Sequence, residues 1–105
     1  MSTLLVNIIK HQIPYRFEIK LANVLFEMEV NYNPQSDFFA IDLYRNKELL
    51  VYGEKLIYGV PLFRDVADRR FPAVTLTPLD ESGKETEVNW KTLGETVFLY
   101  MDGDV

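Results

Sequence analysis

The fold is decided by residues 38–63, which read FFAIDLYRNKELLVYGEKLIYGVPLF. At the start of this stretch the apolar side chains of Phe39, Ile41 and Leu43 alternate with residues of the opposite phase. A period of two is typical of a β-strand with one buried face. The polar run 45–48 then predicts a four-residue hairpin loop. The centre of the chain therefore predicts consecutive antiparallel strands, a β-meander.

The meander is predicted to continue through two more apolar runs. Residues 49–52 read as the return strand, which we expect to end at Gly53, and residues 56–58 read as a second run that stops at Gly59. Pro61 restricts the backbone of the exit. Glycine and proline therefore mark the predicted corners of this region.

The same alternation occurs nearer the N-terminus. Residues 15–21 and 24–32 alternate apolar and polar side chains, and the connection 22–23 contains an asparagine, which tolerates a positive φ. These features predict a hairpin with one face in water. On that face we expect opposite charges to meet across the strands, Arg16 and Lys20 against Glu27 and Glu29.

The remaining strands are predicted from shorter β-prone runs at 3–9, 73–77, 87–88 and 96–101. We expect Pro78 to end the second of these runs, because proline lacks the backbone N–H that a ladder needs.

Helical structure is expected in two short places only. Residues 62–71 predict a helical turn or a surface loop, because they lack a wide apolar stripe. Residues 89–94 predict one turn, with Asn89 as the N-cap and Gly94 as the left-handed stop. We expect Trp90 to pack in the core beneath that turn.

Together these patterns predict an all-β fold. The 105 residues fit one domain, 1–105, and that length can bury a core without covalent staples. About seven to eight short, mainly antiparallel strands with closely spaced turns indicate a small β-sandwich or barrel with one or two short helical turns.

Composition narrows the possible partners. The chain has no cysteine and a net charge of −5, and residues 61–105 hold five basic and nine acidic side chains. This balance argues against nucleic acid, because phosphate binding needs a basic face. No stretch approaches the roughly 20 apolar residues that a bilayer span needs, and residues 4–9 are too short for a signal peptide. We therefore expect no membrane insertion.

A search for reactive side chains finds no complete site. His11 is the only histidine and has no neighbouring serine or carboxylate in the sequence. The oxygen-rich loop 80–85 has a lysine where a calcium loop needs a ligand, and Gly53 and Gly59 lack the Lys-Ser/Thr pair of a phosphate loop. Glu27 and Glu29 share one face of a predicted strand, and that face reads as the ordinary solvent side. We predict no catalytic, cofactor-binding or metal-binding residue.

The aromatic residues are the remaining signal. Most of the seven Phe and six Tyr fall on the inward phase of a strand. Four others are harder to place on that phase, and they form our candidate interface: Phe38, Tyr44, Tyr52 and Tyr58. Out-of-phase aromatics indicate either a second buried face within a closed barrel or a surface for a partner.

The order of the motifs resembles a known family. Residues 13–33 give an Ile-Pro-Tyr start, an alternating strand, an asparagine turn and a second strand, and 39–43 follow as Phe-Ala-Ile-Asp-Leu. Further on come Gly-Val-Pro-Leu at 59–62, Trp-Lys-Thr-Leu-Gly at 90–94 and a closing Val-Phe-Leu-Tyr strand at 97–100. This succession is similar to that of the baseplate plug proteins, which are small all-β components of the tail baseplate of contractile-tailed phages and prophages.

The resemblance implies a structural virion protein without catalysis, made in the host bacterial cytoplasm. Such a protein would pack at the baseplate centre against hub or spike proteins and help to close the tail channel. Three alternatives remain open. The chain could be an assembly factor that does not stay in the particle, or a ligand- or carbohydrate-binding module that exposes Trp90, Tyr52 or Tyr58. It could also be a small hydrolase that uses carboxylate side chains. The oligomeric state is not predicted.

Overall fold

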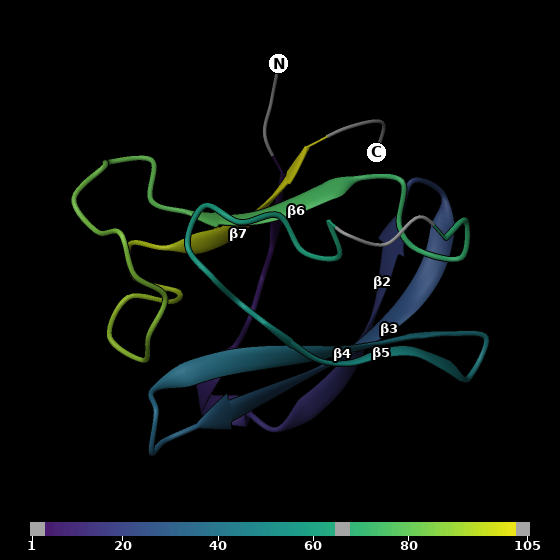
Figure 1. Ribbon diagram of the computed structural model, residues 1–105, viewed down its shortest axis with the longest axis horizontal. Coiled ribbons are helices and arrows are strands. Elements are labelled where there is room, and N and C mark those ends of the chain that lie inside the picture. The colour runs from purple at the N-terminus through teal and green to yellow at the C-terminus, as the bar shows by residue number, and fades with distance from the viewer. Residues whose placement is uncertain (1–3, 65–67, 103–105) are drawn as a thin grey trace.

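The computed structural model describes residues 4–64 and 68–102, which form two antiparallel β-sheets that face each other (Figure 1). The larger sheet has the order β2-β3-β4-β5, formed by Tyr15–Leu21, Val24–Asn33, Phe38–Arg45 and Glu48–Lys55. The smaller sheet has the order β1-β7-β6, formed by Leu4–Val6, Phe98–Asp102 and Thr75–Leu79. The predicted all-β fold is confirmed with seven strands in the described part, and of the sandwich and the barrel that the sequence left open, the structure has the sandwich.

Two tight turns build the larger sheet. Ala22 and Asn23 have φ of 51° and 66°, and Asn46 and Lys47 have φ of 52° and 66°. Positive φ at both central residues is the type I′ pattern, whose twist matches that of the flanking strands. The second turn corrects the expected four-residue loop, because the residues that flank Asn46 and Lys47 pair with each other and only two residues remain unpaired.

The strand after that turn does not end at Gly53. With φ of 73°, Gly53 lets β5 pass through an irregularity in its register and continue to Lys55. Residues 56–58 are not a strand. They begin a crossing segment, residues 56–64, that carries the chain from the larger sheet to the smaller one (Figure 1).

The crossing segment covers the outer edge of β6. The N–H groups of Gly59 and Leu62 donate to the carbonyl oxygens of Pro78 and Leu76, both at 2.8 Å. Pro78 therefore lies inside β6, in contrast to the expectation that it would end the strand. Its backbone faces the edge and not β7, so the missing N–H removes no bond between the strands.

The other corrections concern element ends. The strand expected at 3–9 covers Leu4–Val6, and a 3₁₀ turn, η1 (Lys10–Gln12), follows it. Residues 87–88 form no strand, and residues 65–67 of the expected helical turn at 62–71 lie outside the described residues. The described residues of that segment, 62–64 and 68–71, form turns and no helix.

The core lies between the two sheets. The larger sheet contributes side chains that are fully buried, Phe26, Met28, Val30, Phe39, Ile41 and Leu43. The smaller sheet contributes the buried side chains of Val6, Leu76 and Leu99. Residues of the opposite phase on β2 to β5 therefore point away from the core and form a surface that we call the outer face. None of the helical structure described in the chain could cross a membrane.

Candidate interaction surface

Three of the four predicted interface residues lie on the outer face. Phe38 and Tyr44 alternate with the buried residues of β4, and Tyr52 on β5 is 79% exposed. Tyr58 lies elsewhere, in the crossing segment, where its hydroxyl accepts a 3.1 Å hydrogen bond from the N–H of Asp80. The structure thus brings together the first three residues and separates the fourth.

Strand register gives a map of the outer face. One row across the sheet contains Glu18, Glu27, Tyr44 and Leu49, which pair successively from β2 to β5. The next row contains Arg16, Glu29 and Asp42. Acidic and apolar side chains are therefore neighbours on this surface.

Arg16 ties the two rows together. Its guanidinium forms an ion pair with Glu29 at 3.2 Å and lies 4.0 Å from the centre of the Tyr44 ring. This pairing confirms half of the predicted charge pattern. The other half is wrong, because Lys20 faces Leu25 and Glu27 faces a second glutamate. The two-residue turn decides this register, since each residue of β2 faces the residue equally distant on the other side of the turn.

A hollow of about 290 Å³ opens on the outer face between Phe38 and Tyr52. Asp42 and Gly53 are among the residues that line it. Asp42 is only 3% exposed, and its Oδ1 accepts a 2.8 Å hydrogen bond from the N–H of Gly53. The ammonium of Lys55 lies 4.7 Å from the centre of the Phe38 ring, which lines the hollow. The aromatic rings are thus held beside a hydrogen-bonded carboxylate.

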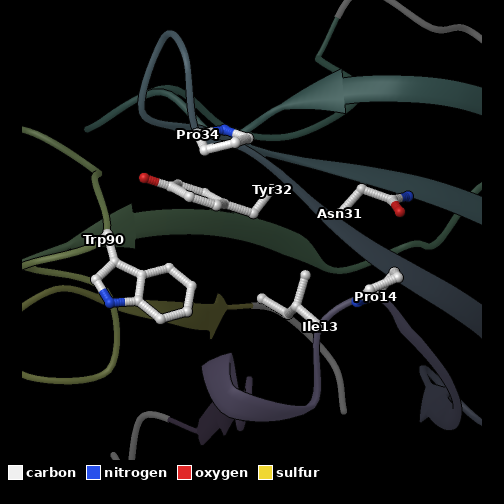
Figure 2. A pocket seen from close by; sticks show the side chains of 6 residues that line it. All are labelled: Ile13, Pro14, Asn31, Tyr32, Pro34 and Trp90. Carbon is white, nitrogen blue, oxygen red and sulfur yellow. The ribbon is translucent and has the colours of Figure 1, made fainter.

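A larger groove of about 500 Å³ lies where the start of β2, the end of β3 and the turn at 89–94 meet (Figure 2). Figure 2 shows that aromatic and proline rings form most of its walls. The lining residues are Ile13, Pro14, Asn31, Tyr32, Pro34 and Trp90. Sequence reasoning missed this groove, because its walls come from segments that are distant in the chain.

Trp90 forms one wall of the groove. It is 37% exposed and packs its ring 4.9 Å from that of Tyr32 and 6.1 Å from that of Phe39. The expectation that Trp90 would be a core residue is therefore wrong in part: one side packs on the core and the other faces the groove. The exposed ring of His11, in the turn η1, lies 6.0 Å from the indole in an edge-on arrangement.

Backbone contacts hold the indole in place. The ammonium of Lys10 donates to the carbonyl oxygen of Trp90 at 2.6 Å. Asp37 accepts from the N–H of Trp90 at 2.9 Å and from the hydroxyl of Tyr32 at 2.6 Å. The tyrosine hydrogen bond lowers the pKa of the Asp37 carboxyl, with the Trp90 N–H adding to it, and the same bond raises the pKa of Tyr32.

The turn that carries Trp90 forms as its sequence predicts. The side chain of Asn89 accepts hydrogen bonds from the N–H groups of Lys91 and Thr92, both at 3.1 Å. Gly94 has φ of 84°, a conformation that favours glycine. The N-cap and stop residues are confirmed, although the segment forms hydrogen-bonded turns and not a helix.

The loop 80–85 uses its carboxylate internally. Asp80 accepts hydrogen bonds from the hydroxyl and N–H of Ser82 and from the N–H of Glu85, at 2.6 to 2.9 Å. The bond from the Ser82 hydroxyl lowers the pKa of Asp80 most. In residues 4–64 and 68–102 no three His, Cys, Asp or Glu side chains gather closely enough to hold a metal ion.

The fold and these surfaces define a small all-β protein with an aromatic sheet face and an open apolar groove, both suited to contacts with other proteins. A family model described as the cyanophage baseplate Pam3 plug gp18 matches residues 5–104. The chain therefore belongs to this family of phage baseplate plug proteins, as the order of its motifs predicted. No curated protein matches the chain. Family membership makes it a structural component of the phage tail baseplate in the virion.

Proposed function

We propose that the chain is a plug that packs against the central hub or spike proteins of the baseplate and acts only through protein–protein contacts. The observation that supports this most is the family match over residues 5–104. A plug needs neither a catalytic residue nor a cofactor, and we propose that the chain has neither.

The outer face and the groove supply the contact surfaces in this proposal. Interfaces are enriched in Tyr, Trp and Phe, because these side chains bury a large area with few rotatable bonds. Tyr52 is 79% exposed and Trp90 is 37% exposed, so both have surface left to bury in a partner. The groove between Trp90 and Tyr32 would accept a side chain of the neighbouring protein.

Peptide mass spectrometry of gradient-purified particles tests the proposal. The particles come from induced host cells that carry the phage or prophage which encodes the chain. We expect the chain at a constant, low copy number per particle, and we expect cross-links from its outer face or groove to hub or spike proteins. An empty-capsid fraction of the same gradient is the control for adhering protein.

Two outcomes would contradict this function. If the chain were abundant in the lysate and absent from particles, an assembly factor made in the host cytoplasm would describe it better. If it were present in particles but cross-linked only to outer baseplate proteins, the central position would be wrong while the structural role stood.

A further inference from the structure

Two glutamates of the outer face lie directly opposite each other. Glu18 on β2 and Glu27 on β3 are register partners, and both side chains point away from the core. Like charges in opposite positions of an antiparallel pair are destabilising. The isolated chain therefore carries an unfavourable element at the middle of the β2–β3 hairpin.

Neither glutamate of this pair has a direct ion-pair partner in the described part of the chain. No ion pair joins either carboxylate to a lysine or arginine among residues 4–64 and 68–102. Arg16, the nearest arginine on the same face, is already paired with Glu29 and stacked on Tyr44. Lys20 lies two positions from Glu18 on the same face, but it forms no ion pair there.

Exposed apolar side chains surround the pair. In the row of the two glutamates, Tyr44 and Leu49 follow on the next strands, and Leu49 is 47% exposed. Leu25, two positions before Glu27 on β3, is 54% exposed. Apolar side chains that gather on one exposed face among polar residues are typical of a surface that binds another protein.

We propose that this part of the outer face, centred on Glu18 and Glu27, docks a basic and apolar surface of another baseplate protein, which places an arginine or lysine between the two carboxylates. Two adjacent carboxylates in a chain of net charge −5 attract a cation, so a basic partner surface would be complementary in charge. An arginine suits the site best, because its fork of N–H donors can bond to both carboxylates at once. The apolar neighbours Leu25, Tyr44 and Leu49 would then exclude water around the ion pairs.

This inference rests on the proposed function, because it names the chemistry of the partner surface. It also explains why the like-charge pair can exist: the free chain is strained by it, and the assembled baseplate relieves that strain. The chain would therefore be less stable alone than a variant without the pair, and yet assemble better.

The experiment complements a phage that lacks the gene with plasmid-borne variants and counts copies per purified particle by targeted mass spectrometry. Glu18→Lys is the main variant, because it converts the repulsive pair with Glu27 into an attractive one while it repels a cation from the partner. Glu18→Gln with Glu27→Gln removes both charges without adding one. Glu81→Lys, in the exposed loop 80–85, is the matched control for a charge reversal.

We expect Glu18→Lys to leave the thermal midpoint of the purified chain unchanged or to raise it by about 1–4 °C. We expect the same substitution to lower the copy number per particle about tenfold or more. The double glutamine variant should lose incorporation in the same direction, and Glu81→Lys should match the original chain. If Glu18→Lys itself lowered the midpoint, the double glutamine variant alone would carry the comparison.

The inference is overturned if the chain is found in particles and the charge variants are incorporated as well as the original. If the original chain is absent from particles, the proposed function fails instead, so the two failures are distinguishable. A bound divalent cation in place of a partner arginine would also overturn the inference, and it would appear as a calcium- or magnesium-dependent rise in the thermal midpoint that the glutamine variant loses.

Discussion

The carboxylate of Asp37 and the backbone N–H of Trp90 meet at 2.9 Å, although 53 positions separate these residues in the chain. Asp37 lies in the turn between β3 and β4, and Trp90 lies in the turn that precedes β7. The hydroxyl of Tyr32 donates to the same carboxylate oxygen at 2.6 Å. One carboxylate therefore fixes both aromatic walls of the groove.

From this contact we predict how the free energy of unfolding changes at acid pH. Because folding lowers the pKa of Asp37, chiefly through the Tyr32 hydroxyl, the ionised carboxylate stabilises the native state above the ordinary pKa of about 4. That stabilisation is lost as the pH falls through the lower pKa of the folded state. Urea unfolding from pH 7 to pH 2 should show the original chain losing more stability than Asp37→Asn, whose side chain does not titrate.

The control for this prediction is Asp80→Asn. The pKa of the Asp80 carboxyl is also lowered, but by the hydroxyl and N–H groups of its own loop, and Asp80 does not line the groove. Both variants should flatten the acid dependence, and only Asp37→Asn should shift the emission of Trp90. An acid dependence that Asp37→Asn left unchanged would contradict the assigned hydrogen bond.

Adjacent phenylalanines on β4 test the assignment of faces. Phe39 is fully buried and packs 4.8 Å from the ring of Tyr32, whereas Phe38 is half-buried on the outer face. Phe39→Ala should lower the free energy of unfolding by about 3–5 kcal/mol, because it leaves a cavity in the core. Phe38→Ala, the matched control, should lower it by about 1 kcal/mol or less. Equal losses in denaturant unfolding would mean that the face assignment is wrong.

The hydrogen bond between Asp42 and Gly53 gives a third prediction. Asp42→Ala leaves the N–H of Gly53 without its acceptor beneath the outer face, so it should cost about 1–3 kcal/mol of unfolding free energy. Asp42→Asn keeps an acceptor oxygen and should recover most of that loss. Hydrogen exchange at the Gly53 amide checks the cause directly: the alanine variant should exchange faster there, and an unchanged rate would argue that the carboxylate acts in another way.

The fourth prediction separates a plug from a sugar-binding module. The Tyr32 ring at 4.9 Å and the Lys10 ammonium at 5.2 Å from the ring centre already cover part of the indole of Trp90, and its remaining surface opens onto the groove that we assign to a partner side chain. We therefore expect a panel of glycans to leave the fluorescence of Trp90, the single tryptophan, unchanged. Acrylamide, which needs only exposure, should quench it. Saturable quenching by one glycan would favour the binding module.

Much of the sheet could be predicted from the sequence because its signals are local. Alternation along β2, β3 and β4 identifies the buried face, since a side chain on a strand points to one face or the other by its position alone. The turn at Ala22 and Asn23 also contains enough information to pair Glu18 with Glu27, because a two-residue turn sets the register. The wrong pairing of Lys20 came from expecting opposite charges to meet.

Local signals were weaker where the chain leaves the regular strands. Gly53 and Pro78 usually interrupt strands, but β5 accommodates the glycine by an irregular register and β6 accommodates the proline at its outer edge. Whether a breaker ends a strand depends on which side its backbone faces, and that is set by neighbouring segments.

The sequence alone therefore determined the strands β2, β3 and β4, their buried phase and, through the order of its motifs, the family. Only the tertiary structure placed Phe38, Tyr44 and Tyr52 on one face, placed Tyr58 elsewhere and fixed Trp90 at the groove through hydrogen bonds to Asp37 and Lys10. The physical reason is the range of the contacts: alternation and turns depend on neighbours in the chain, whereas these surfaces form from segments that meet only when the two sheets pack together.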